Sequence, residues 1–424
     1  MLPLRDCGIA GYPACRAGSG RARGTYDTGG SDAGTWRGMS MSDKLTNDWD
    51  PRSDDVLRDQ AAAYDDMRHR CPVAHSDYLN LSLFRHEDVI RVLNDPETFS
   101  SAVSSYLSVP NGMDPPEHTQ YRSIIEPYFS PQRMAVFEPV CREIAVSLVN
   151  GLPRCGEVEF NVRFAQEFAI QIQCAFLGWP QDLRTPLLHW IRKNREATLT
   201  GDRIALDRVA LEFDTYIKGL LERRRESGAD APDDITTNLL RDRIGDRLLN
   251  DDEIVSILRN WTVGELGTIA ACVGILSHYL AEHFDVQRQL REQPSLLSTA
   301  IDEILRIRAP LIANRRISTK PVEIGGCEVP VGQRITLIWG SANRDETIFG
   351  DPDEFRLDRD PACNLLYGAG IHACPGAPLA RLELRICMEE LLARTNWIAL
   401  LPGGLVAKAV YPGAGFSVLP LCIK

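Results

Sequence analysis

The sequence predicts a mainly α-helical protein with small β-sheets, an α+β fold in which helices form most of the chain. Three observations predict this class. Apolar residues recur at intervals of three and four from about residue 56 onward, which is typical of amphipathic helices. Apolar and polar residues alternate only in short pieces, most of them late in the chain. No linker rich in proline or serine and no repeat of fixed period divides residues 41–424, so we expect a single domain there.

The individual elements follow from the same two periods. Helical periodicity is clearest in six segments, at 135–152, 162–177, 205–225, 251–283, 296–308 and 379–392. Strand-like alternation is found in shorter segments, at 78–83, 322–324, 327–329 and 334–339 and in the tail after residue 397.

Residues 1–40 differ from the rest of the chain. They hold 9 of the 32 glycines and show neither helical nor strand periodicity, so we expect a disordered leader rich in glycine and arginine. The basic start is not followed by the ~7 to 15 apolar residues of a secretory signal. A transit peptide is the alternative, and the acidic residues Asp6, Asp27 and Asp32 argue against it.

Composition and charge exclude several classes of protein. The chain is 44% hydrophobic and carries a net charge of −11, without a dense basic stretch, which argues against a nucleic-acid partner. Apolar runs such as 269–276 are shorter than the ~20 residues of a membrane span, so we expect no membrane anchor. The twelve cysteines show no CxxC spacing, which predicts thiols in a reducing compartment, the cytoplasm.

The most informative segment is a glycine-rich loop at 367–381. Its glycines, Gly368 and Gly376 among them, let the backbone run close to a large, flat group. Cys374 precedes a helix that we expect to begin near Pro378. The N–H groups and the dipole of a helix N-terminus lower the pKa of a cysteine, so this position suits a metal-ligating sulfur.

Two other interpretations compete for this loop. Residues 368–373 also fit the dinucleotide fingerprint GxGxxA, but no second parallel strand with an acidic residue follows, so we reject this interpretation. The other is a buried structural cysteine in a glycine-rich turn, which the loop considered alone leaves open.

The loop resembles the haem-thiolate signature of the cytochrome P450 family over ten positions, with Tyr367 where phenylalanine is usual. Three further segments resemble the family in the right order. Glu303 and Arg306 are similar to its Glu-x-x-Arg pair. Residues 342–345 and 349–355 are similar to the loop that packs against that pair, and 114–122 to the start of its haem-flanking helix. The chain is therefore identified as a member of this family.

The resemblance covers about residues 45–424 and implies the family's fold, a triangular, prism-like helical domain that encloses haem b (iron protoporphyrin IX). It implies that Cys374 is the axial thiolate ligand of the haem iron. The phenol of Tyr367, which would shield this sulfur, must find a polar partner or reach solvent. The positions implied to bind the cofactor are His118, Arg122, Arg316, Tyr367, Gly368, His372, Cys374 and Gly376.

Four of these positions would hold the two haem propionates. A chain that is already negative needs basic partners in order to bury two carboxylates. The resemblance assigns this role to His118, Arg122, Arg316 and His372. A solvated helix face is the alternative for the first two, and Arg315 could take the place of Arg316. Glu303 and Arg306 are expected to form a buried ion pair that is structural only.

The chain departs from the family in its longest helix. The usual pattern there is Ala-Gly-x-acid-Thr-Thr, in which the acid and the hydroxyl relay protons, but this chain has Leu266 and Gly267 at these two positions. Gly264 still permits close approach to the oxygen site, and Gly267 is expected to widen or kink the helix. The candidate catalytic residues are Gly264, Glu265, Gly267 and Thr268.

Three explanations for the missing relay stay open. Glu265 or Thr268 serves through a distorted helical turn and ordered water, the substrate donates its own polar group, or the enzyme uses peroxide, which brings its own protons. The alternative for Glu265 is a carboxylate that points away from the haem.

The resemblance implies a monooxygenase that inserts one oxygen atom of O2 into a small apolar or aromatic substrate. The electrons would come from a separate ferredoxin and an NAD(P)H-dependent ferredoxin reductase, because the pattern contains no fused flavin or ferredoxin module. The alternatives are a peroxide-driven peroxygenase and a non-catalytic haem-binding recruitment protein on the same fold.

Overall fold

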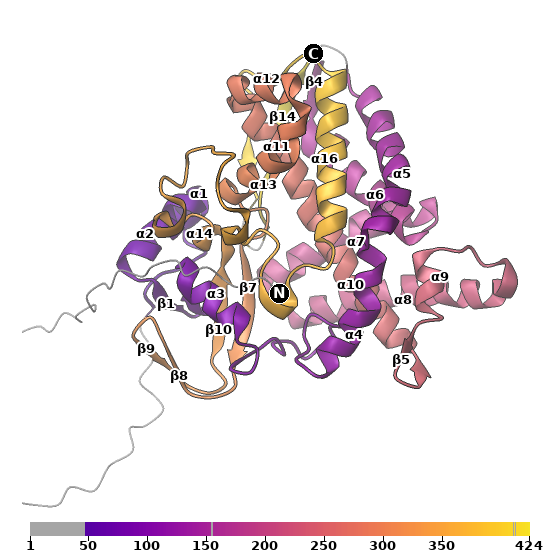
Figure 1. Cartoon of the computed structure of the whole chain (residues 1–424), viewed down its shortest axis with the longest axis horizontal. Helices are drawn as coiled ribbons and strands as arrows, with labels where there is room; N and C mark the ends of the chain where they lie inside the picture. The colour runs from indigo at the N-terminus through magenta and orange to yellow at the C-terminus, as the bar shows by residue number, and fades with distance from the viewer. Residues whose placement is uncertain (1–46, 154–155, 410, 412) are drawn as a thin grey trace, which may run out of the picture.

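A helix-rich region and a sheet-rich region make up the described residues, which are 47–153, 156–409, 411 and 413–424 of a computed structural model. Figure 1 shows the two regions side by side, with α5, α16 and α11 on one side and β1, β10 and β7 on the other. The predicted leader at 1–40 lies outside the described residues, so it and the boundary at 41 stay predictions.

All six predicted helices are confirmed, with ends that differ by at most four residues. Several shorter helices were not among those predicted. The α-helices are α1 (Asp54–Arg58), α2 (Gln60–Arg70), α3 (His86–Asn94), α4 (Glu117–Ile125), α5 (Pro131–Asn150), α6 (Gln166–Leu177), α7 (Arg184–Thr200), α8 (Arg203–Ser227), α9 (Ile235–Leu239), α10 (Asp251–Val263), α11 (Ala270–Glu282), α12 (Phe284–Glu292), α13 (Leu297–Ile307), α14 (Trp339–Ala342), α15 (Glu346–Phe349) and α16 (Ala377–Arg394). Short 3₁₀ or π segments used below are η2 (Asn161–Ala165), η5 (Gly264–Ile269) and η8 (Gly370–His372).

The strands are short, and each of the predicted ones is confirmed. The strands are β1 (Val73–Ser76), β2 (Asn80–Leu83), β3 (Phe99–Ser100), β4 (Gly156–Glu159), β5 (Arg243–Ile244), β6 (Arg247–Leu248), β7 (Ala313–Ser318), β8 (Val322–Ile324), β9 (Cys327–Val329), β10 (Arg334–Ile338), β11 (Ile398–Leu400), β12 (Ala407–Lys408), β13 (Phe416–Val418) and β14 (Pro420–Ile423).

The main sheet has the strand order β1-β2-β10-β7-β3. Only the β2–β10 pair is parallel, and Thr336 lies opposite Arg315 in the antiparallel β10–β7 pair. Strand β7 was not predicted, because its sequence Ala-Asn-Arg-Arg-Ile-Ser is polar. It is nevertheless an inner strand, because β10 and β3 flank it on both sides.

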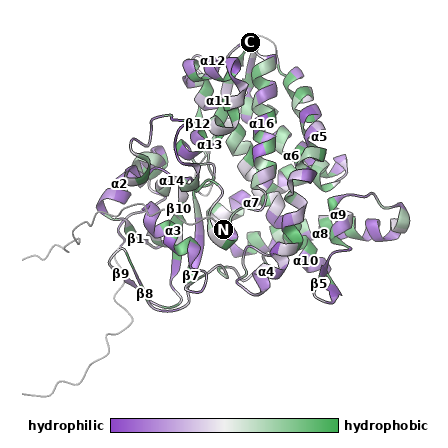
Figure 2. Ribbon diagram, viewed as in Figure 1, coloured by the Kyte–Doolittle hydropathy of each residue, from purple (hydrophilic) through white to green (hydrophobic). Residues whose placement is uncertain are grey.

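The largest hydrophobic cluster joins the long helices. Its buried side chains come mainly from α5, α6, α10, α11, α13 and α16. Figure 2 colours the chain by hydropathy and shows hydrophobic residues interspersed with hydrophilic ones along α16. This packing holds α16, and with it the loop that precedes it, against the long central helix.

The central helix runs without a break from Asp251 to Glu282 through α10, η5 and α11. A capping box starts it, in which the Asn250 side chain accepts from the N–H of Glu253 and the Glu253 carboxylate accepts from the N–H of Asn250. The helix is long and apolar enough to cross a membrane, but 67% of its most apolar window is buried inside the protein, as in a core helix. Its middle, η5, is a π-helical turn, which confirms the distortion predicted around Gly267.

The predicted ion pair is buried and has additional partners. Arg306 donates through Nε to Glu303 Oε2 at 2.8 Å, and both side chains are at most 5% exposed. The guanidinium also donates to the carbonyls of Asn343 and Pro352, at 2.8 and 3.0 Å, in the loop that was predicted to pack against the pair. Arg359 supplies a second cation to Glu303 at 2.9 Å. The pair therefore ties α13 to the segment that leads to the cysteine loop.

Candidate active site

The cysteine loop is held in place by its own backbone. The N–H of Cys374 donates to the carbonyl of Tyr367 at 2.8 Å, and the turn η8 lies between them. Gly370 has a φ of +68°, and a Cβ at this position would lie 2.2 Å from the backbone oxygen of Leu93. Only glycine fits there, so this glycine fixes the distance between the loop and α3.

The sulfur of Cys374 lies at the N-terminus of α16. The N–H groups of Gly376 and Ala377 lower the pKa of the thiol, as does the charge of Arg122, but burial is the largest effect and raises the pKa above its ordinary value. The expectation that the pKa is lowered is therefore wrong for the protein groups alone, because desolvation outweighs the two N–H donors. The surface of Cys374 that is accessible opens onto the cavity described next.

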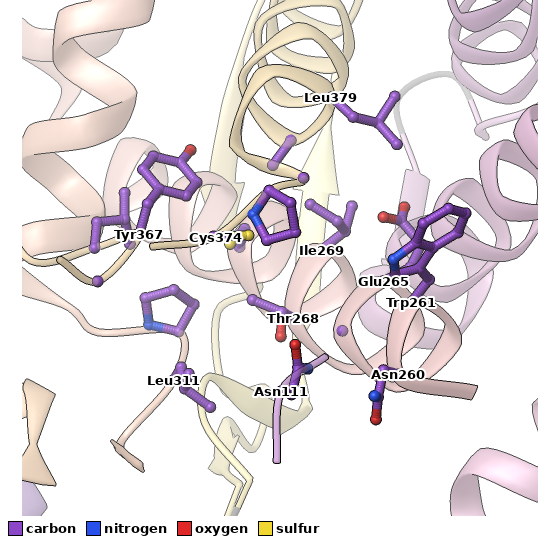
Figure 3. Close-up of a pocket in the computed structure, with 18 of the residues that line it drawn as sticks. Asn111, Asn260, Trp261, Glu265, Thr268, Ile269, Leu311, Tyr367, Cys374 and Leu379 are labelled. Carbon is purple, nitrogen blue, oxygen red and sulfur yellow. The ribbon is translucent and has the colours of Figure 1, made fainter. Parts of the chain in front are cut away.

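A cavity of about 380 Å³ lies between the cysteine loop and η5. Figure 3 shows Cys374 and Tyr367 from the loop, and Glu265, Thr268 and Ile269 from the central helix, around this space. The predicted site residues that line the cavity are Gly264, Glu265, Thr268, Arg316, Tyr367, Gly368, His372, Cys374 and Gly376.

Basic side chains without anionic partners gather at one edge of this cavity. Neither ring nitrogen of the buried His118 has a hydrogen-bond partner among the described residues, and the same holds for Nε2 of His372. The two rings lie 4.3 Å apart between centroids. Arg316 is 4% exposed, donates to the carbonyl of Arg315 at 2.7 Å and makes no ion pair within the described part of the chain.

The pKa values of these groups also indicate that their charged forms are unfavourable in the protein alone. Burial, followed by the charges of Arg316 and His118, lowers the pKa of His372 to about 3. Burial also lowers the pKa of Arg316 to about 10. Buried cations and unpaired imidazoles are unfavourable without an anion, so this edge is built for a group that brings negative charge. The two carboxylates of a haem meet this requirement.

Arg122 and Arg315 are placed differently. Arg122 donates to the carbonyl of Ala373 at 2.9 Å and pairs with Glu126 at 3.0 Å, so it already braces the cysteine loop from α4. Arg315 is the neighbour of Arg316 on β7, where successive side chains point to opposite faces, and only Arg316 lines the cavity. The structure therefore selects Arg316 over the alternative, Arg315.

The central helix divides the predicted catalytic residues between two faces. Gly264, Glu265 and Thr268 line the main cavity. Gly267 does not: together with Leu266 it lines a separate space of about 50 Å³ on another face of the helix. Spacings of three and four residues give this division. The catalytic role of Gly267 stays a prediction that its place outside the main cavity does not support. In Figure 3 the Thr268 hydroxyl points toward Asn111, and the Glu265 carboxylate points away from both.

Tyr367 differs from the expectation that its phenol finds a polar partner or reaches solvent. Its hydroxyl is buried and has no hydrogen-bond partner among the described residues. The guanidinium of Arg381 lies over its ring, 4.4 Å from the ring centroid. The same guanidinium pairs with Asp302 at 3.1 Å. Packing on the ring face thus holds this side chain, rather than a hydrogen bond to its phenol.

Sequence reasoning missed two side chains near the cavity. The indole N–H of Trp339 is buried, lines the cavity and lacks a partner among the residues described. Glu383 of α16 is fully buried beside Glu265. Neither residue belongs to a motif that the sequence made visible, because each is brought to the site only by packing.

The comparisons with known proteins agree with this geometry. The family model described as Cytochrome P450 matches residues 196–400. A cyclomarin C epoxidase, CymV, of Salinispora arenicola is 31% identical over 78% of this chain and 88% of its own length. Cytochrome P450 130 of Mycobacterium tuberculosis is 30% identical over 80% of this chain and 86% of its own.

The chain belongs to the cytochrome P450 family. The P450 is also similar to a vitamin D(3) 25-hydroxylase of Pseudonocardia autotrophica, with 34% identity over 69% of this chain and 71% of the hydroxylase. Among solved structures, CYP109E1 of Bacillus megaterium in complex with testosterone has a TM-score of 0.76 and 26% identity, and covers 85% of this chain and 98% of its own. As a P450 monooxygenase, the protein takes a haem-thiolate cofactor and acts on a substrate with O2 and redox partners. The P450 fold and a mostly helical chain with small sheets are confirmed.

Proposed function

We propose that this P450 inserts one oxygen atom of O2 into a small apolar or aromatic substrate, with haem b as its cofactor. We further propose that electrons come from a separate ferredoxin and an NAD(P)H-dependent ferredoxin reductase, and that the protein works in the cytoplasm. The observation that carries the proposal is a cavity with one cysteine sulfur on its wall and unpaired bases at its edge.

Each residue around the cavity has a distinct task in this proposal. Cys374 holds the cofactor through its sulfur, which the N–H groups of Gly376 and Ala377 orient. His118, His372 and Arg316 take the propionates, and Arg122 fixes the loop through the Ala373 carbonyl. When bound there, haem supplies a thiolate-ligated iron that activates O2. Gly264, which has no side chain, leaves room for oxygen beside the central helix.

The substrate side of the cavity is apolar with a few amides. Asn260 donates to the carbonyl of Val109 at 3.0 Å, and Asn314 accepts the N–H of Arg315 at 2.7 Å, so their polar groups are already engaged. Leu311 and Trp261 add apolar surface. Such a lining favours a compact apolar ligand. Asn111 and Thr268 are the polar groups that we expect to orient it.

The test begins with the thiolate bond. Reduced holoprotein treated with carbon monoxide should show the red-shifted Soret band of a thiolate complex, and Cys374→Ala should lose it. A screen of apolar and aromatic compounds by haem spin-state change should then identify ligands. A native protein without the red-shifted band, or a Cys374→Ala variant that keeps it, contradicts the proposal.

One observation favours a second function, a peroxide-driven peroxygenase. The positions of the usual proton-relaying acid and hydroxyl hold Leu266 and Gly267, and both residues line a separate space instead of the main cavity. Product formation should be compared with hydrogen peroxide alone and with NADH, ferredoxin and reductase. Turnover with peroxide and none with the redox partners would establish the second function in place of the first.

A further inference from the structure

Two glutamates meet inside the protein, one from each of the elements that enclose the cavity. Glu265 belongs to η5 and is 9% exposed, and Glu383 belongs to α16 and is 0% exposed. Each lies within side-chain hydrogen-bonding reach of the other. Glu265 also lines the cavity, where Figure 3 shows its carboxyl group beside Trp261. Glu265 thus connects the fully buried Glu383 to the cavity.

The protein supplies no cation and almost no hydrogen-bond donor to this pair. Oε1 of Glu265 and both carboxyl oxygens of Glu383 lack a hydrogen-bond partner among the described residues. The titratable groups that face the pair are the thiols of Cys141 on α5, Cys272 on α11 and Cys387 on α16, together with Cys374 at the cavity. Burial raises the pKa of each of these thiols, so they bring no positive charge.

The basic residues nearby in the fold are occupied elsewhere. Arg142 pairs with Glu138, Glu389 and Glu390 at 2.5 to 2.9 Å, in a network on the outer side of α5 and α16. Two ionised carboxylates side by side in a dry interior would be strongly unfavourable. One added proton removes this penalty, because the O–H of one carboxyl group then donates to the oxygen of the other. Burial raises the pKa of Glu265 to about 7, although its hydrogen bond with Glu383 lowers it, and burial together with the charge of Glu265 raises the pKa of Glu383.

We propose that Glu265 and Glu383 form a shared-proton pair, and that Glu265 passes this proton to oxygen chemistry in the cavity in place of the missing acid and hydroxyl at 266 and 267. In the step, the O–H bond of Glu265 breaks, the proton bonds to an oxygen atom in the cavity, and the electron pair stays on the carboxylate. A proton from water then restores the pair. Glu383 is a positioning residue, and its hydrogen bond to Glu265 lowers the pKa of that carboxyl group, which makes Glu265 the readier proton donor of the two. The proposal rests on the proposed function, since it needs a reaction in the cavity that consumes protons.

The chain offers a matched control on the same helix. Glu390 lies seven residues after Glu383, and it is 7% exposed, but its carboxylate is paired with Arg142 at 2.5 Å and with Arg394 at 3.0 Å. Glu390→Gln therefore removes a buried glutamate that is held in ion pairs instead of facing a second carboxyl group.

The first experiment is infrared spectroscopy of the holoenzyme at neutral pH. A protonated carboxyl group absorbs apart from carboxylates and backbone amides, and the wild-type protein should show one such band. The band should be absent from the Glu265→Gln/Glu383→Gln double variant and present in Glu390→Gln. A wild type without the band, or a double variant that keeps it, overturns the proposal.

The second experiment measures proton delivery without substrate or redox partner. Electrons are supplied from an electrode, and the O2-reduction current is divided by the amount of electroactive haem. Loss of a positioned proton donor slows a reaction by about 10²-fold or more, so Glu265→Gln should lower the normalised current at least tenfold. Glu383→Leu removes the hydrogen bond that lowers the pKa of Glu265, so it should shift the pH profile of the current to higher pH. Glu390→Gln should change neither. A Glu265→Gln current within twofold of wild type overturns the delivery step.

A carbon monoxide spectrum of the same preparations separates the two proposals. If the thiolate signature is present but the infrared band is missing, the proton-pair proposal fails alone. If the thiolate signature is missing, the proposed function fails as well.

Discussion

The buried charged and polar side chains of this protein fall into two kinds: those with a hydrogen-bond or ion-pair partner in the chain and those without one. Glu303 and Arg306 are almost completely buried and make charged hydrogen bonds to each other and to the surrounding backbone. Arg316 and His118 are buried to the same degree, but Arg316 lines the cavity without an ion pair, and neither ring nitrogen of His118 has a hydrogen-bond partner among the described residues. The first kind of burial stabilises the fold, whereas the second is favourable only when an anion is bound.

Arg306→Ala should lower the free energy of unfolding by roughly 3 to 5 kcal/mol, because Glu303 would keep its buried charge without this partner. Urea denaturation of the two proteins measures the difference. Arg58→Ala, which removes a surface pair with Asp55 of 3.1 Å, is the control and should cost less than about 1 kcal/mol. Equal losses for the two variants would contradict the structural role.

Tyr367→Phe should leave the stability unchanged or raise it by up to about 1 kcal/mol, because the hydroxyl is buried without a partner in the described chain. Tyr121→Phe is the matched control: this hydroxyl donates to Glu253 at 2.6 Å, so its loss should cost about 1.5 to 3 kcal/mol. Thermal unfolding of both variants and of the wild type measures these two changes in stability. A large loss for Tyr367→Phe would mean that a buried water satisfies its phenol.

At the scale of elements, the central helix does more than contribute to the core. One face presents Gly264, Glu265 and Thr268 to the cavity, and another presents Leu266 and Gly267 to a separate space. Spacings of three and four residues give this division, and they continue through the π turn to Cys272. The helical period therefore decides which side chains reach the reacting space.

Gly264→Ala and Gly267→Ala test this division. Neither new Cβ would meet an atom within 4 Å, so each variant should gain about 0.5 to 1 kcal/mol of stability from the lower backbone entropy of the unfolded chain. Only Gly264 lines the main cavity. Imidazole titration of the haem should therefore be weakened by Gly264→Ala and unaffected by Gly267→Ala. The reverse order would contradict the observed faces of the helix.

The start of the same helix should make stability depend on acid pH. A hydrogen bond from Arg247 is the largest of several effects that lower the pKa of Glu253 from 4.5 to about 2. Because the folded pKa is the lower one, this stabilisation is complete above pH 4.5 and is lost as the pH falls toward 2. Glu253→Gln should make the free energy of unfolding depend less on pH across this range. Asn250→Ala, which removes the other half of the capping box, should cost about 1 kcal/mol without flattening it.

At the scale of the whole molecule, the cofactor completes the fold. Basic groups from α4, β7 and the cysteine loop converge on one edge of the cavity, and the charge of Asp114 offsets the cost of their burial only in part. A ligand that binds only the folded state stabilises it by mass action. We therefore expect the free energy of unfolding of the holoprotein to exceed that of the apoprotein by more than the burial of the apolar haem surface contributes.

Arg316→Leu should separate the two contributions. The apoprotein should be as stable as the wild type or more stable, because a buried cation is replaced by an apolar side chain. Haem should be lost to excess apomyoglobin about tenfold faster or more, because a charge-assisted hydrogen bond is worth about 1.5 to 3 kcal/mol. Arg315→Leu is the control on the opposite face of β7 and should not change the rate of haem loss. Equal rates for the two variants would contradict the role of Arg316.

The sequence predicted a large part of this arrangement. The six long helices follow from apolar periodicity, which their packing in the core requires, and the strands β8 and β9 were predicted to the residue. The inner strand β7 could not be predicted, because its polar composition reflects the cavity beside it rather than a sheet interior. Tyr367 was expected to have a polar partner, and only packing shows that Arg381 covers its ring instead.

By itself, the sequence determined the helical class, the cysteine loop, the Glu303–Arg306 pair and the departure at 266 and 267, because local period and spacing encode them. Only the tertiary structure decided that Arg316 rather than Arg315 faces the cavity, that Gly267 leaves it, and that Glu265 meets Glu383. The physical reason is that these outcomes depend on which faces distant helices present to each other. Packing and burial determine which faces meet, and they cannot be derived from the local pattern of any single segment.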